Sequence, residues 1–169
     1  MSLIYNVYSD GSTKRNGKTD SVGAWAYVAV KDGEIITKNA GSEVCTTNQR
    51  MELMAALEAL KDIVPMVENK GVIRLYTDSA YLHNCYTQKW YINWQENGWK
   101  NTKKQPVANA DLWKELVPYF EAWGIDFFKV KGHSNNNTEH EKWNNVVDVL
   151  AQGTAEERQR QVKNESCSN

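Results

Sequence analysis

Five short stretches rich in apolar and aromatic residues predict β-strands, because each is bounded by turn-forming residues. The second and third stretches are joined by Asp32-Gly33, and an Asp-Gly pair between two such runs is a strong hairpin signal. The first three strands are therefore expected to be antiparallel. The five stretches are residues 3–9, 23–30, 35–40, 72–77 and 125–130.

A helical pattern follows the third predicted strand. Thr46 and Gln49 have the spacing of a capping box and precede a run of good helix formers, which predicts a helix over residues 46–60. Its apolar stripe consists of Leu53, Leu57, Leu60 and Val64. Glu52 falls about 100° from the centre of this stripe, at its margin, since each helical residue advances the chain by about 100°.

The second half of the chain predicts four more helices. Asn109 is expected to cap one of them, in which apolar residues repeat at i, i+3, i+4 and i+7. These are Trp113, Leu116, Val117 and Phe120. The last helix is predicted over residues 143–151, after a polar loop of residues 131–142. The two remaining helices are short, at residues 79–86 and 88–94.

The order of these elements predicts an α/β fold. We expect a mixed five-stranded sheet, three antiparallel strands followed by two parallel ones, with helices on both faces. The sequence shows neither a linker nor an internal repeat, so we place one domain at residues 1–152. Residues 153–169 are almost wholly polar, and this C-terminal tail is expected either to extend the last helix or to be disordered.

The composition limits the function classes. A chain of 169 residues with 41% apolar residues can bury the core of one domain. It contains no apolar run long enough to cross a membrane and no export signal at its start, so no membrane association and a cytoplasmic location are expected. Three widely spaced cysteines fit a reducing compartment. The net charge of -1 means that any nucleic-acid binding must depend on a local patch.

Two of the predicted strands end in a carboxylate. The first leads into Asp10-Gly11 and the fourth into Asp78-Ser79. If these strands are parallel neighbours, the two acids lie side by side at one edge of the sheet, where α/β proteins position functional groups. Taken alone, each Asp favours the simpler interpretation that it caps the following turn or helix. Glu52 alone is equally compatible with a solvated surface position.

The motifs, taken together, resemble a known family. In order they are Tyr8-Ser9-Asp10-Gly11-Ser12, Thr46-Thr47-Asn48-Gln49-Arg50-Met51-Glu52, Tyr76-Thr77-Asp78-Ser79, Gly98-Trp99-Lys100, Asn109-Ala110-Asp111-Leu112-Trp113, Val130-Lys131-Gly132-His133 and Asp148-Val149-Leu150-Ala151. The chain resembles a bacterial-type ribonuclease H of type 1 from Ile4 to Ala151. The resemblance implies that residues 1–152 form the catalytic domain.

The resemblance also implies a metal centre and a reaction. The four metal-binding carboxylates of the family fall on Asp10, Glu52, Asp78 and Asp148, and its mobile-loop histidine falls on His133. The expected cofactor is a pair of Mg²⁺ ions, because carboxylates supply the oxygen ligands that hard ions take. Mn²⁺ is a possible substitute, and no small-molecule cofactor is expected. The expected reaction is endonucleolytic hydrolysis of the RNA strand of an RNA:DNA hybrid, leaving 5′-phosphate and 3′-hydroxyl ends. We expect a monomer.

Other residues are expected to contact the hybrid. Asn48 and Gln49 match minor-groove contacts of the family, and Thr47 and Asn93 match its pocket for a DNA-strand phosphate. A segment that mixes aromatic and basic residues adds Trp90, Trp94, Lys100, Lys103 and Lys104. Some tryptophans of this segment are equally compatible with the core, Trp113 above all.

Three departures from the family pattern bear on the hybrid. Ala80 stands where a Gln often contacts the RNA strand, and Gln95-Glu96-Asn97 stands where many members are basic. Asp148 follows His133 by fifteen positions, so the loop between them is longer than in the commonest bacterial members. Two competing interpretations are kept: a detached reverse-transcriptase ribonuclease H domain or another nuclease of the same fold, and a module that binds hybrid without cutting it.

Overall fold

The structure is a computed structural model that describes residues 3–130 and 138–167. Five strands form one sheet in the order β3-β2-β1-β4-β5. The pairs β1/β2 and β2/β3 are antiparallel, whereas β1/β4 and β4/β5 are parallel, as the sequence predicts. The strands are β1 (Ile4–Lys14), β2 (Val22–Lys31), β3 (Glu34–Val44), β4 (Val72–Thr77) and β5 (Ile125–Lys129).

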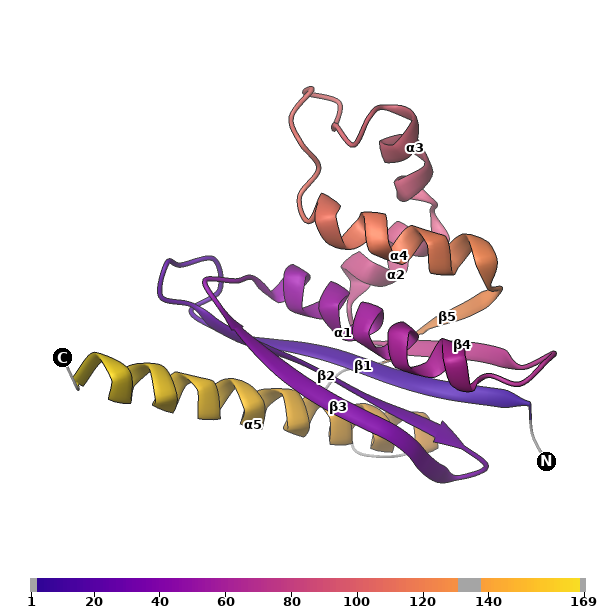
Figure 1. Cartoon of the computed structure of the whole chain (residues 1–169), viewed down its shortest axis with the longest axis horizontal. Helices are drawn as coiled ribbons and strands as arrows, with labels where there is room; N and C mark the ends of the chain where they lie inside the picture. Colours follow the sequence, from indigo (N-terminus) through magenta and orange to yellow (C-terminus); the bar gives the residue numbers. More distant parts are fainter. Residues whose placement is uncertain (1–2, 131–137, 168–169) are drawn as a thin grey trace.

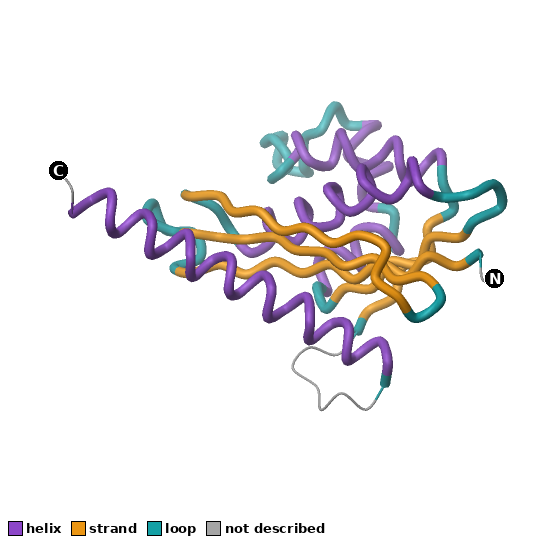
Figure 2. Tube along the Cα trace, turned by 60° about the horizontal axis from the view of Figure 1, so that its bottom comes forward, coloured by secondary structure: helices purple, strands orange, loops and turns teal. Residues whose placement is uncertain are grey.

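Helices cover both faces of the sheet (Figure 1). α1 and α4 lie on one face, and α5 crosses the strands on the other, which Figure 2 shows from below. α3 and the loop after it stand beyond α4, away from the sheet (Figure 1). The helices are α1 (Asn48–Ile63), the one-turn η1 (Val64–Met66), α2 (Ala80–Thr87), α3 (Trp90–Glu96), α4 (Ala110–Ala122) and α5 (Glu139–Cys167).

The two faces carry cores of different size. On the α1 side, the stripe residues Leu53, Leu57 and Leu60 pack with a large aromatic cluster that includes Trp113, which is fully buried as predicted. On the α5 side, a smaller cluster centres on Tyr8 and reaches α5 at Val147 and Ala151. The larger cluster fixes α1 and α4 on the sheet, and the smaller one fixes the middle of α5.

The close approach of α1 to β1 depends on Gly11. A Cβ atom built on Gly11 would lie 2.7 Å from the backbone nitrogen of Glu52 and from the carbonyl carbon of Met51. Those distances are far inside van der Waals contact, so only glycine lets the helix cross the strand there. This crossing places Glu52 beside Asp10.

The final helix begins earlier than the sequence analysis predicts. α5 starts at Glu139 instead of residue 143, because Thr138 accepts a hydrogen bond from the Glu141 backbone nitrogen at 3.1 Å and caps the helix. α5 also continues through the polar tail to Cys167, so the tail extends the helix as far as the structure describes it.

Of the helices within residues 3–130 and 138–167, none is sufficiently long and apolar to traverse a bilayer.

Two predicted caps differ in detail. Thr47, not Thr46, caps α1 by accepting a hydrogen bond from the Arg50 backbone nitrogen at 3.2 Å. Thr46 lies one residue before the cap, is buried, and donates its backbone N–H to Ser21 Oγ. Asn109 precedes α4 in a left-handed conformation and makes no side-chain cap. Its side-chain oxygen accepts a hydrogen bond from Arg50 instead.

Candidate metal centre

Three carboxylates from three elements meet at one edge of the sheet. Asp10 on β1, Glu52 on α1 and Asp78 directly after β4 each offer an oxygen, and these oxygens lie within 4.8 Å of one another. Asp10 is buried, at 2% exposure, and the other two are half-buried. We call these three residues the acid cluster.

The register of the sheet explains this meeting. Tyr8 and Tyr76 are partners on the parallel strands β1 and β4, and Asp10 and Asp78 each follow two residues later. β4 ends at Thr77, just before Asp78, whereas β1 does not end at Asp10 as the sequence predicts but continues to Lys14, because β2 pairs with it over that length. Asp10 therefore lies within β1, just beyond its pairing with β4 and beside the point where β4 ends. The structure therefore brings together Asp10, Glu52 and Asp78 from three distant parts of the sequence.

Asp148 lies on α5, which packs on the face opposite to α1. The structure does not place an Asp148 oxygen within the 4.8 Å group of the acid cluster. The Asp148 carboxylate instead accepts hydrogen bonds from Gln152 Nε2, which lies 3.1 Å from each of its two oxygens. Asp148 nevertheless reaches Asp10, because a hydrogen bond between the two side chains and the charge of Asp148 both contribute to raising the pKa of Asp10.

The electrostatics of the acid cluster are those of crowded like charges. Burial is the first cause that raises the Asp10 pKa far above its ordinary value, and the charges of Glu52 and Asp78 are the next. The pKa of Glu52 is likewise raised, first by burial and then by Asp78, although a hydrogen bond from the Gly11 backbone opposes the shift. Without a counter-charge, the cluster therefore disfavours full ionisation.

The cluster has the donors that a hard divalent cation requires. Asp10 Oδ2 and Glu52 Oε2 are buried, and neither has a hydrogen-bond partner among the described residues. Buried carboxylate oxygens without partners are costly unless a cation or a proton compensates them. Oxygen-only ligands are the ligands that Mg²⁺ prefers. The residues present therefore fit a magnesium site.

The structure places the predicted substrate residues in two groups. Thr47, Asn48 and Gln49 form an exposed group at the start of α1, two turns or less from Glu52. The Asn48 backbone nitrogen donates to Asn16 Oδ1 at 2.8 Å, which ties this turn to the loop between β1 and β2. His133 lies outside the described residues.

The second group lies on α3 and the loop after it, residues 90–106, which we call the α3 protrusion. Trp90, Asn93, Trp94 and Lys100 line one cavity of about 220 Å³. Lys100 and Lys104 line a second cavity, of about 530 Å³, and Asn97 borders both. Lys103 lines neither cavity. The structure thus brings most of the predicted aromatic and basic residues together on one exposed surface.

Sequence reasoning missed three residues near the site. Arg50 pairs with Glu43 and with Asp111, at 2.9 Å each, and so joins the first turn of α1 to β3 and α4. Gln152 holds Asp148, and their i, i+4 spacing on a helix is a signal that the sequence contains. His140 contacts β1 and β4, which no sequence pattern indicates, because it stands in the segment predicted as a loop.

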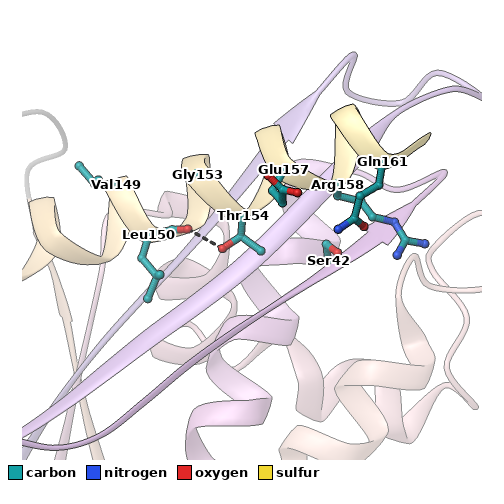
Figure 3. Close-up of a pocket in the computed structure, with 8 residues that line it drawn as sticks. All are labelled: Ser42, Val149, Leu150, Gly153, Thr154, Glu157, Arg158 and Gln161. Atoms are coloured by element: carbon teal, nitrogen blue, oxygen red, sulfur yellow. Dashed lines mark hydrogen bonds between the residues drawn. The ribbon is translucent and has the colours of Figure 1, made fainter. Parts of the chain in front are cut away.

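A further cavity lies between α5 and β3. It has a volume of about 480 Å³ and is lined by Ser42, Val149, Leu150, Gly153, Thr154, Glu157, Arg158 and Gln161 (Figure 3). Thr154 Oγ1 donates to the Leu150 carbonyl at 2.7 Å, a bond drawn in Figure 3. None of the four acids lines this groove, so it does not belong to the candidate metal centre.

Comparisons with known proteins agree on one family. The family model described as RNase H matches residues 4–156. The Ribonuclease H of Syntrophomonas wolfei is 46% identical over 148 residues, covering 86% of this chain and 91% of that protein. The Ribonuclease H of Moorella thermoacetica is 39% identical over 155 residues, covering 92% and 93%.

Solved structures show the same fold. LC9-RNase H1, a type 1 RNase H with the type 2 active-site motif, superposes with a TM-score of 0.72 at 26% identity and covers 92% of this chain and 73% of that one. The foamy viral protease-reverse transcriptase in complex with an RNA/DNA hybrid gives a TM-score of 0.76 at 22% identity, covering 89% of this chain and 20% of that one.

Proposed function

The chain belongs to the ribonuclease H family, and we infer that it is a metal-dependent endoribonuclease acting on the RNA strand of RNA:DNA hybrids. The observation that carries this inference is the acid cluster, where three carboxylates from separate elements converge with oxygens within 4.8 Å. A family member without this cluster would lack the ligands for metal-assisted hydrolysis. This chain retains them.

We propose that Asp10, Glu52, Asp78 and Asp148 hold two Mg²⁺ ions, which Mn²⁺ can replace. Bound in pairs, such ions supply an activated water and stabilise charge on the attacking and leaving oxygens of an in-line displacement. The protein residues do the positioning: β1, α1 and β4 fix three carboxylates from a packed core, and Gln152 orients the fourth. In the proposed reaction water adds to the phosphorus and the P–O3′ bond breaks, so that the products carry 5′-phosphate and 3′-hydroxyl ends.

The substrate contacts are a further part of the proposal. The exposed turn of Thr47, Asn48 and Gln49 stands beside the acid cluster on α1, so it is suited to the minor groove and to a phosphate of the hybrid. The α3 protrusion supplies rings and lysines for the DNA strand. Shape and backbone contacts of this kind select a hybrid rather than a base sequence.

His133 is proposed to move a proton to or from the leaving group, since an unperturbed histidine titrates near pH 6.5. Replacing His133 with Ala is expected to slow turnover by about 10²-fold, at the lower end of the range for acid-base catalysis, because water substitutes in part. Single-turnover cleavage kinetics measure this effect. Complete inactivity would assign His133 another role.

Two alternatives to this proposal are less well supported. The likeness to reverse transcriptases is at about a fifth sequence identity and concerns the fold, whereas the bacterial Ribonuclease H relatives match over nearly their whole length. A module that binds hybrid without cutting it has no need for crowded acids, which destabilise the metal-free fold. We also propose that the chain acts in the cytoplasm as a monomer.

One assay separates these possibilities. The purified chain is incubated with an end-labelled RNA:DNA hybrid, with double-stranded RNA and double-stranded DNA as controls, with Mg²⁺, with Mn²⁺ or with chelator. We expect cleavage of the hybrid alone, dependent on a divalent ion. Binding without cleavage would support the module, and cleavage of double-stranded DNA would indicate another nuclease of the fold.

A further inference from the structure

One side chain, His140, joins the first turn of α5 to the two strands that carry Asp10 and Asp78. A hydrogen bond links Tyr8 Oη on β1 to His140 Nδ1, at 2.6 Å. The imidazole ring also stacks on Tyr76 of β4, with ring centroids 4.3 Å apart and planes inclined by 18°. A single ring therefore contacts two strands and belongs to the helix that packs against them.

These contacts lie directly before the acids. Tyr8 precedes Asp10 by two residues, and Tyr76 precedes Asp78 by two residues. Residues two apart on a strand share a face of the sheet, so the ring of His140 lies on the face of β1 to which Asp10 belongs. Three of the four proposed metal ligands are thus carried by elements that meet at this ring.

The contact is held in a packed environment. Tyr8 is 1% exposed and Tyr76 is 5% exposed, and their rings stack on each other at 4.8 Å. A buried hydroxyl such as that of Tyr8 is costly when it is left without a partner, so the bond to His140 is retained in the folded chain. The bond therefore restricts how far the start of α5 can slide or turn relative to β1.

Asp148 depends on that restriction. It lies eight residues after His140 on the same helix, just over two turns away, and a helix transmits a displacement of its first turn with little loss. We propose that His140 is a positioning residue of the metal centre, which sets where α5 places Asp148 relative to Asp10 and Asp78. This inference rests on the proposed function, because it assumes that the acids bind metal together.

Two variants remove the same bond from opposite sides. His140→Phe keeps a ring for stacking on Tyr76 but removes Nδ1, and Tyr8→Phe removes the hydroxyl. The matched control is Tyr86→Phe, which also removes a tyrosine hydrogen bond, to the Ile125 carbonyl at 2.7 Å. Ile125 begins β5, at the end of the strand opposite to the acid cluster.

The measurements are Mg²⁺ affinity of the free protein by titration calorimetry, kcat and KM for the hybrid, and melting temperature. We expect His140→Phe and Tyr8→Phe each to weaken Mg²⁺ binding and to lower kcat by about tenfold, with KM unchanged, as is usual when the residue that orients a metal ligand is lost. The double variant is expected to lose no more than either single one, because both remove one bond.

His140→Asn tests the same point by rescue, because an amide places a polar atom close to the position of Nδ1. We expect it to recover part of the Mg²⁺ affinity that His140→Phe loses. Tyr86→Phe is expected to lower the melting temperature alone.

Equal losses of Mg²⁺ affinity in Tyr86→Phe and His140→Phe would overturn the inference, since a general loss of stability would then explain both. Unchanged Mg²⁺ affinity and kcat in His140→Phe would overturn it as well. A wild-type chain that neither binds Mg²⁺ nor cleaves hybrid would instead overturn the proposed function, and this inference with it.

Discussion

The acid cluster and the α3 protrusion are the two halves of the proposed site, and they are built in opposite ways. Asp10 and Glu52 each have a buried carboxylate oxygen with no hydrogen-bond partner in the described part of the chain, and they belong to a strand of the sheet and to the helix packed on it. The α3 protrusion stands away from the sheet (Figure 1), and its lysines are exposed to solvent.

The difference follows from what each half contacts. A small divalent ion needs ligand oxygens at fixed distances, which only side chains anchored in a packed core maintain. A duplex backbone presents many phosphates, so exposed cations and rings bind it without such precision. Substitutions in the first half should therefore act on chemistry and on stability, and those in the second half on affinity.

The largest effect is expected in the acid cluster. Asp10→Asn or Asp78→Asn should reduce cleavage to background and leave hybrid binding within a few-fold, because the acids hold ions and other residues hold the duplex. Cleavage gels and a filter-binding assay measure the two quantities. The control is Asp62→Asn, an exposed acid on α1, which should keep full activity. Strong residual cleavage by either variant would contradict the proposed ligand set.

The sequence predicted this half of the site better than the other half. Asp10 lies within β1 and Asp78 directly after β4, each two residues beyond a pair of partners on these parallel strands, so the register that the apolar pattern predicts brings them together. Glu52 joins them only because α1 crosses β1 closely at Gly11. The sequence contains this glycine but does not indicate that a helix crosses there. The start of α5 was not predicted, because Thr138 caps it within a segment whose polar composition resembles a loop.

The next effect concerns stability without metal. Burial and neighbouring charges raise the pKa of Asp10, whereas in the unfolded chain this carboxyl titrates near pH 4. Between these two pKa values the folded state binds more protons than the unfolded state, so the free energy of unfolding falls as the pH rises. Asp10→Asn should remove this pH-dependent decrease in the free energy of unfolding.

Calorimetry with chelator at pH 5 and pH 7.5 checks this expectation. Asp10→Asn should melt higher than the wild type by at least about 3 °C at pH 7.5, roughly 1 kcal/mol for a chain of this size, and by less at pH 5. Millimolar Mg²⁺ should stabilise the wild type and narrow the gap, because the ion binds only the folded form. A gap that does not change with pH would refute the role of like-charge crowding.

A smaller effect is expected at the fourth acid. Gln152→Ala removes the hydrogen bonds that Gln152 Nε2 donates to the Asp148 carboxylate, so Mg²⁺ affinity and kcat should each fall by about tenfold. Gln161→Ala is the control on the same helix, because Gln161 lines the groove of Figure 3 and not the metal centre. Identical behaviour of the two variants would show that Gln152 has no orienting role.

The α3 protrusion was predicted by composition alone, and the structure explains why no more was possible. Trp94 packs edge-on against the buried Trp113, with ring centroids 5.4 Å apart, whereas Trp90 remains 39% exposed. Both lie in one short segment with similar neighbours in sequence. The packing of α3 against α4 decides that Trp94 is part of the core and that Trp90 is exposed to a ligand. This packing is a tertiary contact, which the local sequence does not determine.

The smallest effect on turnover is expected from charge added to the α3 protrusion. Gln95, Glu96 and Asn97 supply no cation, so the hybrid should bind weakly and with little dependence on salt. The triple variant Gln95→Lys, Glu96→Lys and Asn97→Arg adds cations beside Lys100 and Lys104, because Asn97 borders the cavity that these lysines line. Each additional phosphate that these cations neutralise should steepen the slope of log affinity against log salt by about 0.7–0.9.

Fluorescence anisotropy with a labelled hybrid from 50 to 200 mM salt measures that slope. We expect the slope to steepen by about one to three, with KM lowered and kcat nearly unchanged, since the chemistry takes place at the acids. The control Gln161→Lys, Asn164→Arg and Glu165→Lys introduces the same charge change on the distal part of α5 and should leave the slope close to that of the wild type. Equal slopes for both triple variants would mean that the hybrid does not reach the α3 protrusion. The duplex would then contact the start of α1 but not the α3 protrusion. The surface that binds nucleic acid would have to be sought elsewhere on the chain, while the packed acid cluster would remain the proposed metal site.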